Sequence, residues 1–185
     1  AALVGINGAG KSTLARLLSG MEKPAGGQIV HGSRVKIGFF SQESASNLDY
    51  QKTIWEELNQ SESKATDQQK RNLLGAFLFS GDDVFKPISV LSGGEKSRLA
   101  LLKILIADAN FLILDEPTNH LDIITKNIFQ EALREYPGTL VMVSHDRYFL
   151  DRVVNKVIEL KNGFATVYDG NYSYYIEKRA ETGDS

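Results

Sequence analysis

The sequence contains no cysteine among its 185 residues, which excludes disulfide bonds and cysteine-ligated zinc. The lack of cysteine is compatible with a reducing cytosol, so we expect a cytoplasmic protein. A marked excess of either charge is also missing, because 21 basic residues face 23 acidic ones and leave a net charge of −2. Such a chain has no general attraction to nucleic acid, although a local basic patch is compatible with this total.

Long hydrophobic runs are absent as well. The apolar stretch from Leu99 to Ala107 is interrupted by Lys103 and falls well short of the ~20 residues that cross a bilayer. We therefore expect no direct insertion into a membrane. The first residues do not resemble a signal peptide, because the apolar run 1–6 leads straight into a glycine-rich loop. We expect the chain to begin inside a strand and to be a fragment of a longer protein.

The glycine-rich loop carries the first chemical signal. Residues 5–12 fit the phosphate-binding pattern G-x-x-x-x-G-K-[ST], and a strand over 3–6 and a helix over 11–19 are predicted around them. Backbone N–H groups in such a loop converge on phosphate oxygens, so a turn that binds nothing is the weaker interpretation. Lys11 would bridge the β- and γ-phosphates. The residues predicted to bind ATP here are Gly5, Asn7, Gly8, Ala9, Gly10, Lys11, Ser12 and Thr13.

Two adjacent carboxylates follow the apolar strand predicted over 111–114. Asp115 and Glu116 are expensive to bury without a partner or a metal ion. Asp115 and the hydroxyl of Ser12 are predicted to hold Mg²⁺, and Glu116 is predicted to polarise the attacking water as a general base. Helix capping, the structural alternative, needs only one acid. Asp122 directly precedes the next predicted helix and fits a helix cap and a site residue equally well.

Two further polar side chains follow predicted strands. Gln42 comes just after the strand predicted over 35–40, where its amide could reach the metal ion or the attacking water. His145 follows the strand predicted over 139–144, and an imidazole at this edge of a sheet can donate to the γ-phosphate. We assign both residues to the catalytic set and regard Gln42 as a candidate Mg²⁺ ligand as well.

The other histidines and a group of tyrosines near the end of the sequence carry no comparable signal. His31 is assigned to the surface of a hairpin, and neither His31 nor His120 belongs to a metal cluster. Four tyrosines could stack on bases, but aromatic residues at the end of a domain more often pack it shut. These tyrosines are Tyr168, Tyr172, Tyr174 and Tyr175.

The order of predicted elements favours an α/β fold with a mostly parallel sheet flanked by helices. We expect one domain over 1–185, with a core of 1–43 and 90–185 and an inserted helical subdomain at about 44–89. The further elements predicted are a strand over 28–31, helices over 53–58, 67–79 and 123–136, a buried helix over 93–107, a short helix near 147–151 and a hairpin around 161–163.

The stretch Leu91-Ser92-Gly93-Gly94-Glu95 completes the set of motifs. With it, the chain resembles the ABC ATPases, five of whose motifs occur here in order. The resemblance implies a P-loop NTPase fold of the ABC type and an ATPase that uses ATP and Mg²⁺. It also implies that Ser92, Gly93 and Gly94 contact the γ-phosphate of a nucleotide held by a second ABC ATPase domain, in the same parent chain or in a second copy.

Within that family, residues 116–122, 144–151 and 170–175 look like the ABC-F class, and 74–90 is similar to the second ATPase domain of its members. Members of that class carry two ATPase domains in one soluble chain and mostly act on the ribosome. The resemblance therefore implies an ATP-driven dimerisation switch in translation, with ribosome or RNA contacts made through the parent protein. The aromatic residue that stacks on adenine in this family would precede Ala1.

Two other functions share these motifs. The chain could be the ATPase subunit of a membrane transporter, although the residues at 119–122 and the tyrosine-rich tail are unusual for such subunits. It could also be an ATP-gated ABC-F module in ribosome assembly or DNA maintenance, which the sequence separates poorly from a role in translation. The resemblance implies that each ATP site combines the phosphate loop of one domain with the Ser92-Gly93-Gly94 stretch of another. The chain alone holds one half of each such composite site, so it is expected to be a weak ATPase.

Overall fold

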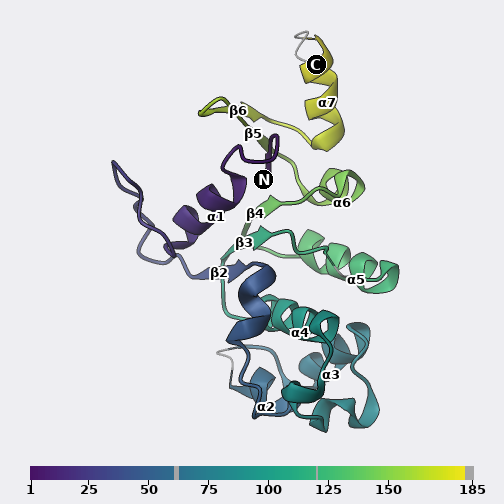
Figure 1. The fold of residues 1–185 in the computed structure, drawn as a ribbon. Helices are drawn as coiled ribbons and strands as arrows, with labels where there is room; N and C mark the ends of the chain where they lie inside the picture. The colour runs from purple at the N-terminus through teal and green to yellow at the C-terminus, as the bar shows by residue number, and fades with distance from the viewer. Residues whose placement is uncertain (61–62, 120, 182–185) are drawn as a thin grey trace.

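A single six-stranded sheet organises the computed structural model, which describes residues 1–60, 63–119 and 121–181 (Figure 1). Its strand order is β2-β3-β4-β1-β5-β6. All neighbours pair in parallel except β5 and β6, which form the predicted hairpin. The strands are β1 (Ala2–Val4), β2 (Ile37–Phe40), β3 (Phe111–Asp115), β4 (Thr139–Val143), β5 (Val157–Lys161) and β6 (Phe164–Tyr168).

Helices connect these strands. The six helices predicted from the sequence are present, with ends at most three residues from the predicted ends, whereas α7 was not predicted. The α-helices are α1 (Lys11–Ser19), α2 (Ile54–Asn59), α3 (Asp67–Ala76), α4 (Gly93–Ile106), α5 (Ile123–Arg134), α6 (Arg147–Val153) and α7 (Tyr172–Glu181). Short 3₁₀ helices lie at η1 (Gln42–Asn47), η2 (Gly81–Phe85) and η3 (Ile88–Val90). Across the described residues, every helix is too short or too polar to cross a lipid bilayer.

Helices cover both faces of the sheet, as the alternation of elements predicted. Ile113 of β3 packs with Ala15 of α1 on one face. The neighbouring Leu112 points to the opposite core, which contains Phe129 of α5 and Phe149 of α6. These two rings stack with their centroids 5.6 Å apart and join the two helices. Successive strand residues thus serve different cores, which is why β3 is apolar at every position before its carboxylate.

Residues between β2 and α4 form the predicted group of helices. α2 and α3 each begin with a capping box, in which Thr53 or Thr66 and the residue three positions later satisfy each other's backbone N–H groups. Figure 1 shows this group beside α4. Lys103 of α4 donates a hydrogen bond to the buried carboxylate of Glu57 in α2 and so ties the group to the rest of the chain.

One predicted strand is missing from the structure. Residues 28–31 lie outside any strand, and β2 begins at Ile37 rather than at Val35. An extended segment becomes a strand only when a neighbouring backbone supplies its hydrogen bonds. None of the described strands pairs with 28–31, and the side chain of Val30 is 78% exposed. The prediction of a strand at 28–31 is therefore wrong for this structure.

The helix predicted to be buried is α4, and the prediction holds mainly for its second half. Leu99, Leu101 and Leu102 are fully buried, whereas the side chains of its first turns are partly exposed. Gly38 of β2 explains the close approach of this helix to the sheet edge. A Cβ at Gly38 would lie 3.5 Å from Ile104 Cγ2 of α4 and 2.7 Å from Leu112 Cδ2 of β3, so glycine leaves room for both side chains.

Candidate nucleotide-binding site

The glycine-rich loop joins the end of β1 to the start of α1. Gly8 and Gly10 have φ angles of 81° and 93°, in the left-handed region where a side chain is strained. Lys11 is buried, and its Nζ donates to the carbonyl oxygens of Gly5 and Ile6 at 2.9 and 3.0 Å. These bonds hold the ammonium group against the loop. The N-terminus of α1, with its exposed N–H groups, opens beside it and favours an anion.

The two adjacent carboxylates lie where β3 ends. Glu116 has a φ angle of 51°, uncommon for a residue with a side chain, and its N–H donates to the carbonyl oxygen of Val143 at 2.8 Å. Asp115 Oδ1 and Glu116 Oε1 are buried and accept no hydrogen bond from the protein. Because buried carboxylate oxygens normally have partners, these two atoms can serve a metal ion or a bound water.

His145 lies beside Glu116 at the end of β4. Its Nε2 is 3.4 Å from Glu116 Oε1, and its backbone N–H donates to Oε2 at 3.4 Å. Burial raises the pKa of the Glu116 carboxyl above its usual range, while His145 and Lys11 oppose this shift and the charge of Asp115 adds to it. A carboxyl with a raised pKa beside an imidazole is suited to accepting a proton from water.

Two adjoining hollows bring most of the predicted residues together. The first is lined by Ser12, Gln42, Asp115 and Glu116, so the three predicted Mg²⁺ ligands and the predicted general base share one space. The second is lined by Asn7, Gly8, Gly10, Lys11, Ser12, Thr13, Glu116 and His145, together with Val143. Ser12 and Glu116 face both hollows. Gly5 and Ala9 belong to the same loop without lining either one.

The chemistry of the first hollow fits Mg²⁺. A carboxylate, a hydroxyl and a side-chain amide are hard oxygen donors, and Mg²⁺ in nucleotide sites is held by one or two carboxylates together with phosphates. No group of three His, Cys, Asp or Glu side chains within the described ranges would form an all-protein metal cage. The individual roles of Ser12, Gln42 and Asp115 remain predictions.

The stretch Ser92-Gly93-Gly94 lies away from these hollows, at the start of α4. Ser92 is the N-cap of this helix, and its hydroxyl and backbone N–H share the carboxylate of Glu95 in a capping box. Ser92 and Gly93 are exposed, and neither hollow includes any of the three residues. That these residues serve a nucleotide held by another domain stays a prediction, with which this placement is compatible.

Asp122 acts as a helix cap in this structure. Its carboxylate accepts hydrogen bonds from the backbone N–H groups of Ile124 and Thr125 at the start of α5. His31 is exposed, as predicted, but the hairpin predicted around it is missing because residues 28–31 form no strand. His120 lies outside the described residues. Three of the four tyrosines, Tyr168, Tyr172 and Tyr175, pack ring against ring, whereas the side chain of Tyr174 is 39% exposed.

Sequence reasoning missed a contact that holds the site together. The hydroxyls of Thr118 and Ser144 are buried and lie 3.3 Å apart, linking the turn after Glu116 to the turn before His145. Ser144 Oγ also accepts the backbone N–H of Asp146 at 3.1 Å. The available signal was a small hydroxyl residue after each of two strands that are neighbours in the sheet.

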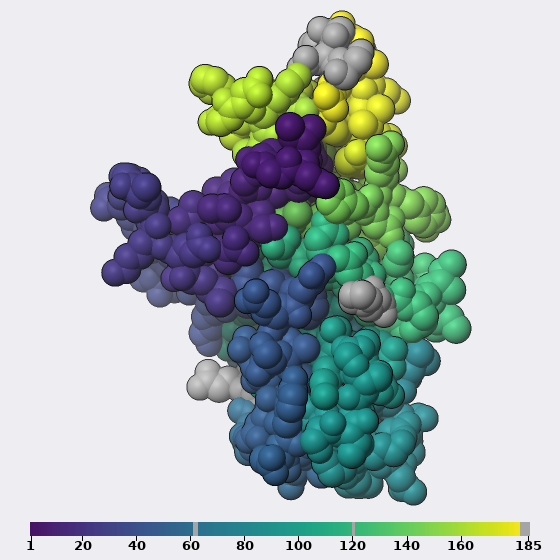
Figure 2. All heavy atoms as spheres, in the orientation of Figure 1, coloured from purple at the N-terminus to yellow at the C-terminus, as the bar shows by residue number. Residues whose placement is uncertain are grey.

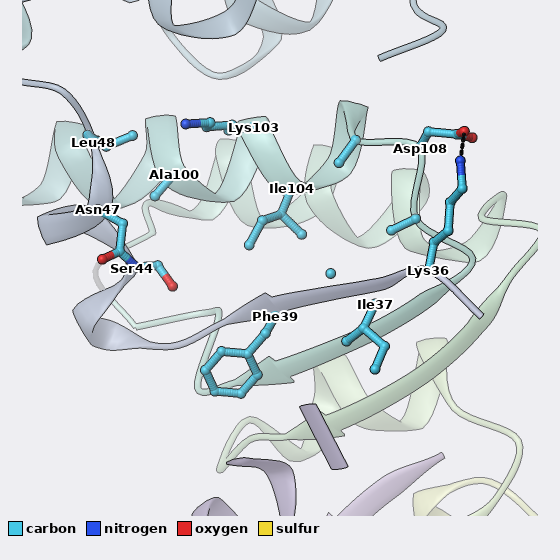
Figure 3. A pocket seen from close by; sticks show the side chains of 13 residues that line it. Lys36, Ile37, Phe39, Ser44, Asn47, Leu48, Ala100, Lys103, Ile104 and Asp108 are labelled. Carbon is cyan, nitrogen blue, oxygen red and sulfur yellow. Dashed lines mark hydrogen bonds and ion pairs between the residues drawn. The ribbon is translucent and has the colours of Figure 1, made fainter. Parts of the chain in front are cut away.

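A third hollow, shown in Figure 3, has a different character. It lies between β2, η1 and α4, and its lining is largely apolar, with Ile104 pointing into it and the ion pair between Lys36 and Asp108 at one end. None of the predicted nucleotide residues lines it. In the space-filling view, the η1 and α4 segments form adjacent parts of the surface (Figure 2). This hollow runs along β2 on the side of α4 and shares only Phe39 with the two hollows of the candidate nucleotide site.

Known proteins match the chain over most of its length. Residues 1–119 match the family described as ABC transporter. The chain is 51% identical to YdiF of Bacillus subtilis, covering 98% of this chain and 28% of YdiF. It is 44% identical to ABC transporter F family member 5 of Arabidopsis thaliana, covering 97% of this chain and 26% of that protein.

A translation factor and a solved structure extend the comparison. The Energy-dependent translational throttle protein EttA of Escherichia coli K12 is 42% identical over 97% of this chain and 33% of its own length. The archaeal ribosome recycling factor aABCE1, solved with the ribosomal stalk protein aP1, superposes with a TM-score of 0.77 at 26% identity, covering 98% of this chain and 36% of that one. The chain thus spans about a third or less of these curated relatives. On its motifs, its fold and these matches, the chain belongs to the ABC transporter family, and its homologues are ABC-F proteins.

Proposed function

We propose that this ATP-binding ABC domain hydrolyses ATP with Mg²⁺ and uses the cycle as a dimerisation switch. The observation that carries the proposal is the convergence of Lys11, Ser12, Asp115, Glu116 and His145 on two adjoining hollows. These residues come from the ends of two parallel strands, β3 and β4, and from the start of α1. Enzymes of open α/β sheets bind ligands at this edge.

Each side chain has a distinct task in the proposal. Lys11 and the N–H groups of residues 7–13 bind the phosphates, and Ser12, Gln42 and Asp115 would hold Mg²⁺, which screens the phosphate charge when bound. Glu116 orients the attacking water and accepts its proton. His145, which lies 3.4 Å from Glu116, orients that carboxylate and donates to the γ-phosphate.

We further propose that the site is completed by a second ABC domain, whose equivalents of Ser92, Gly93 and Gly94 close over the phosphates. The exposure of Ser92 and Gly93 at the N-terminus of α4 supports this, because helix N–H groups there can face an anion on another domain. We retain the proposed division into a core of 1–43 and 90–185 and a helical subdomain of about 44–89.

For the parent protein, we propose a cytoplasmic role on the ribosome in translation. The name of EttA describes a translational throttle, and aABCE1 was solved with a ribosomal stalk protein. Both support a ribosomal partner reached through parts of the parent outside this chain. Co-sedimentation of the parent with ribosomes, with and without ATP, tests this role; ATP-independent or absent co-migration would contradict it.

Titration with a fluorescent ATP analogue and Mg²⁺ tests the roles of the site residues. Lys11→Ala should lower affinity by about tenfold or more, because a charge-assisted contact to the phosphates is lost. Glu116→Gln should retain the affinity and lose hydrolysis, because only the general base is removed. Lys23→Ala, at an exposed position outside both hollows, is the matched control. Equal loss of affinity in the Lys11 and Glu116 variants would refute the assignment.

A further inference from the structure

The helix α7 and the phosphate-binding loop line one common hollow. This hollow is lined by Gly5, Ile6 and Lys11 from the loop region and by Tyr172 and Tyr175 from α7. Ser144 and His145 line it as well. The same lysine and histidine that face the proposed nucleotide side therefore face α7 on their other side. The role assigned so far to the tyrosine-rich tail is packing alone.

A buried acidic group joins α7 to the sheet. Glu159 of β5 is only 6% exposed. Its Oε1 accepts the hydroxyl of Tyr175 at 2.9 Å, and its Oε2 accepts the hydroxyl of Tyr168 at 3.3 Å. Arg179 Nε lies 3.4 Å from Oε1. Burial and the contact with Glu159 raise the pKa of Tyr175 to about 12, so its hydroxyl remains a donor at neutral pH.

The anchored strand segment supports the first residue of the loop. Val4 of β1 pairs with Glu159 in parallel register, so the next residues, Gly5 and Leu160, lie side by side. A Cβ on Gly5 would lie 2.4 Å from the carbonyl oxygen of Leu160, which shows how closely the two backbones approach. The carbonyl oxygen of Gly5 in turn accepts Lys11 Nζ. A continuous set of contacts leads from Tyr175 to the phosphate-binding lysine.

A second contact ties α7 to the other side of the site. The backbone N–H of Ser173 donates to Asp151 Oδ1 at 2.7 Å, and Asp151 belongs to α6. α6 begins two residues after His145. α7 is thus fastened to the strand beside the phosphate loop and to the helix after the proposed catalytic histidine.

We propose that Tyr175 is a positioning residue of the nucleotide site, whose hydroxyl holds buried Glu159 and thereby fixes β5 beneath Gly5 and the phosphate loop. The inference rests on the proposed binding of ATP. If the Tyr175–Glu159 contact only stabilised the fold, its loss would lower the melting temperature and leave the nucleotide affinity of the folded protein unchanged. The two roles therefore make different predictions.

Tyr175→Phe removes the hydroxyl and keeps the ring that packs against Tyr168 and Tyr172. We expect its affinity for the fluorescent ATP analogue to fall by about fivefold and amide exchange across residues 5–12 to speed up, with exchange in β4 unchanged. Tyr174→Phe, which removes a hydroxyl from the 39% exposed neighbour, is the matched control and should change neither quantity. Glu159→Gln, which keeps an acceptor for Tyr175, should lose less affinity than Glu159→Ala.

The possible outcomes distinguish the positioning role of Tyr175 from the proposed binding of ATP. If the unaltered chain binds no nucleotide, the proposed function fails and this inference fails with it. If it binds, but Tyr175→Phe matches the Tyr174 control in affinity and in exchange over 5–12, only the positioning role is overturned. Should Glu159→Ala fold poorly, Tyr175→Phe and Glu159→Gln decide the question, since both retain the volume of the original side chain.

Discussion

At the scale of single residues, Asp122 separates capping from chemistry. Its Oδ1 accepts the N–H groups of Ile124 and Thr125 at 3.0 and 2.9 Å, and its Oδ2 accepts the hydroxyl of Thr125 at 2.8 Å. Both oxygens are therefore engaged in starting α5. Asp115 and Glu116, by contrast, each keep one buried oxygen without a hydrogen bond. Of the two interpretations that the sequence allowed for Asp122, the structure supports the cap.

Replacing this cap should lower the stability of the protein. Asp122→Ala should reduce the free energy of unfolding by about 1 kcal/mol, because two N–H groups at the start of α5 lose their acceptor, and Asp122→Asn should cost less. Urea denaturation measures both changes. Asp82→Ala, an exposed acid in the first turn of η2, is the control and should change the free energy little. Similar losses for Asp82 and Asp122 would contradict the capping role.

The same cap should make stability depend on pH. Hydrogen bonds from Thr125 and Ile124 hold the pKa of the Asp122 carboxyl below its usual value of about 3.9. The folded protein therefore binds this proton less readily than the unfolded chain. The cap contributes its stability above that value and loses it as the pH falls through the lowered native pKa. The stability difference between the natural chain and Asp122→Asn should accordingly narrow below about pH 4.

Gly5 is a residue whose identity the backbone dictates. Its φ angle is 145°, and an added Cβ would lie 2.4 Å from the carbonyl oxygen of Leu160. Gly5→Ala should therefore push β1 and β5 apart, costing about 1–3 kcal/mol of stability and weakening the binding of ATP. Gly26→Ala, where no atom lies within 4 Å of the added carbon, is the control. Chemical denaturation and nucleotide titration measure both changes. Equal stability and equal affinity of the Gly5 and Gly26 variants would contradict this prediction.

At the scale of elements, a helix or strand was predictable where its own residues carry the pattern of that structure. β3 and α5 were predicted to within one or two residues. β3 is a short continuous apolar run, which is typical of a buried strand, and the apolar residues of α5 recur with the helical period. The absence of a strand at 28–31 was not predictable, because pairing depends on a distant backbone that a local pattern does not reveal. The capping boxes at Thr53 and Thr66 were readable from the T-x-x-E and T-x-x-Q spacing and would have fixed both helix starts.

The contact between α2 and α4 should matter more than its single hydrogen bond suggests. Glu57 is 3% exposed, and the ammonium group of Lys103 reaches it from α4. Lys103→Met should lower the free energy of unfolding by about 2 kcal/mol, less than for a fully buried pair because Lys103 itself is partly exposed. Lys64→Met, which breaks an exposed ion pair with Asp108, should cost under about 1 kcal/mol. Thermal or urea unfolding distinguishes the two variants.

At the scale of the whole molecule, topology explains why the site residues were predictable although they are far apart in sequence. Parallel strands place their carboxyl ends at one edge, so residues following β2, β3 and β4 meet there with the loop after β1. The contact between His145 and Glu116 could be found only in the structure, because neither sequence motif shows that β3 and β4 are neighbours in the sheet. The separation of Ser92 from that edge is the feature that makes one chain hold half of each proposed composite site.

That separation leads to a test by complementation. A Lys11→Ala chain keeps an intact Ser92 stretch, and a Ser92→Ala chain keeps an intact phosphate loop. If two copies pair head to tail, mixing the inactive variants restores one complete site per mixed dimer, so a 1:1 mixture should recover about a quarter of natural ATPase activity at saturating concentration, since half of randomly formed dimers are mixed. The activity of the unaltered chain should also rise more steeply than its concentration. Activity strictly proportional to concentration, with no recovery on mixing, would show that each chain hydrolyses ATP alone and that the exposed start of α4 has no part in the site.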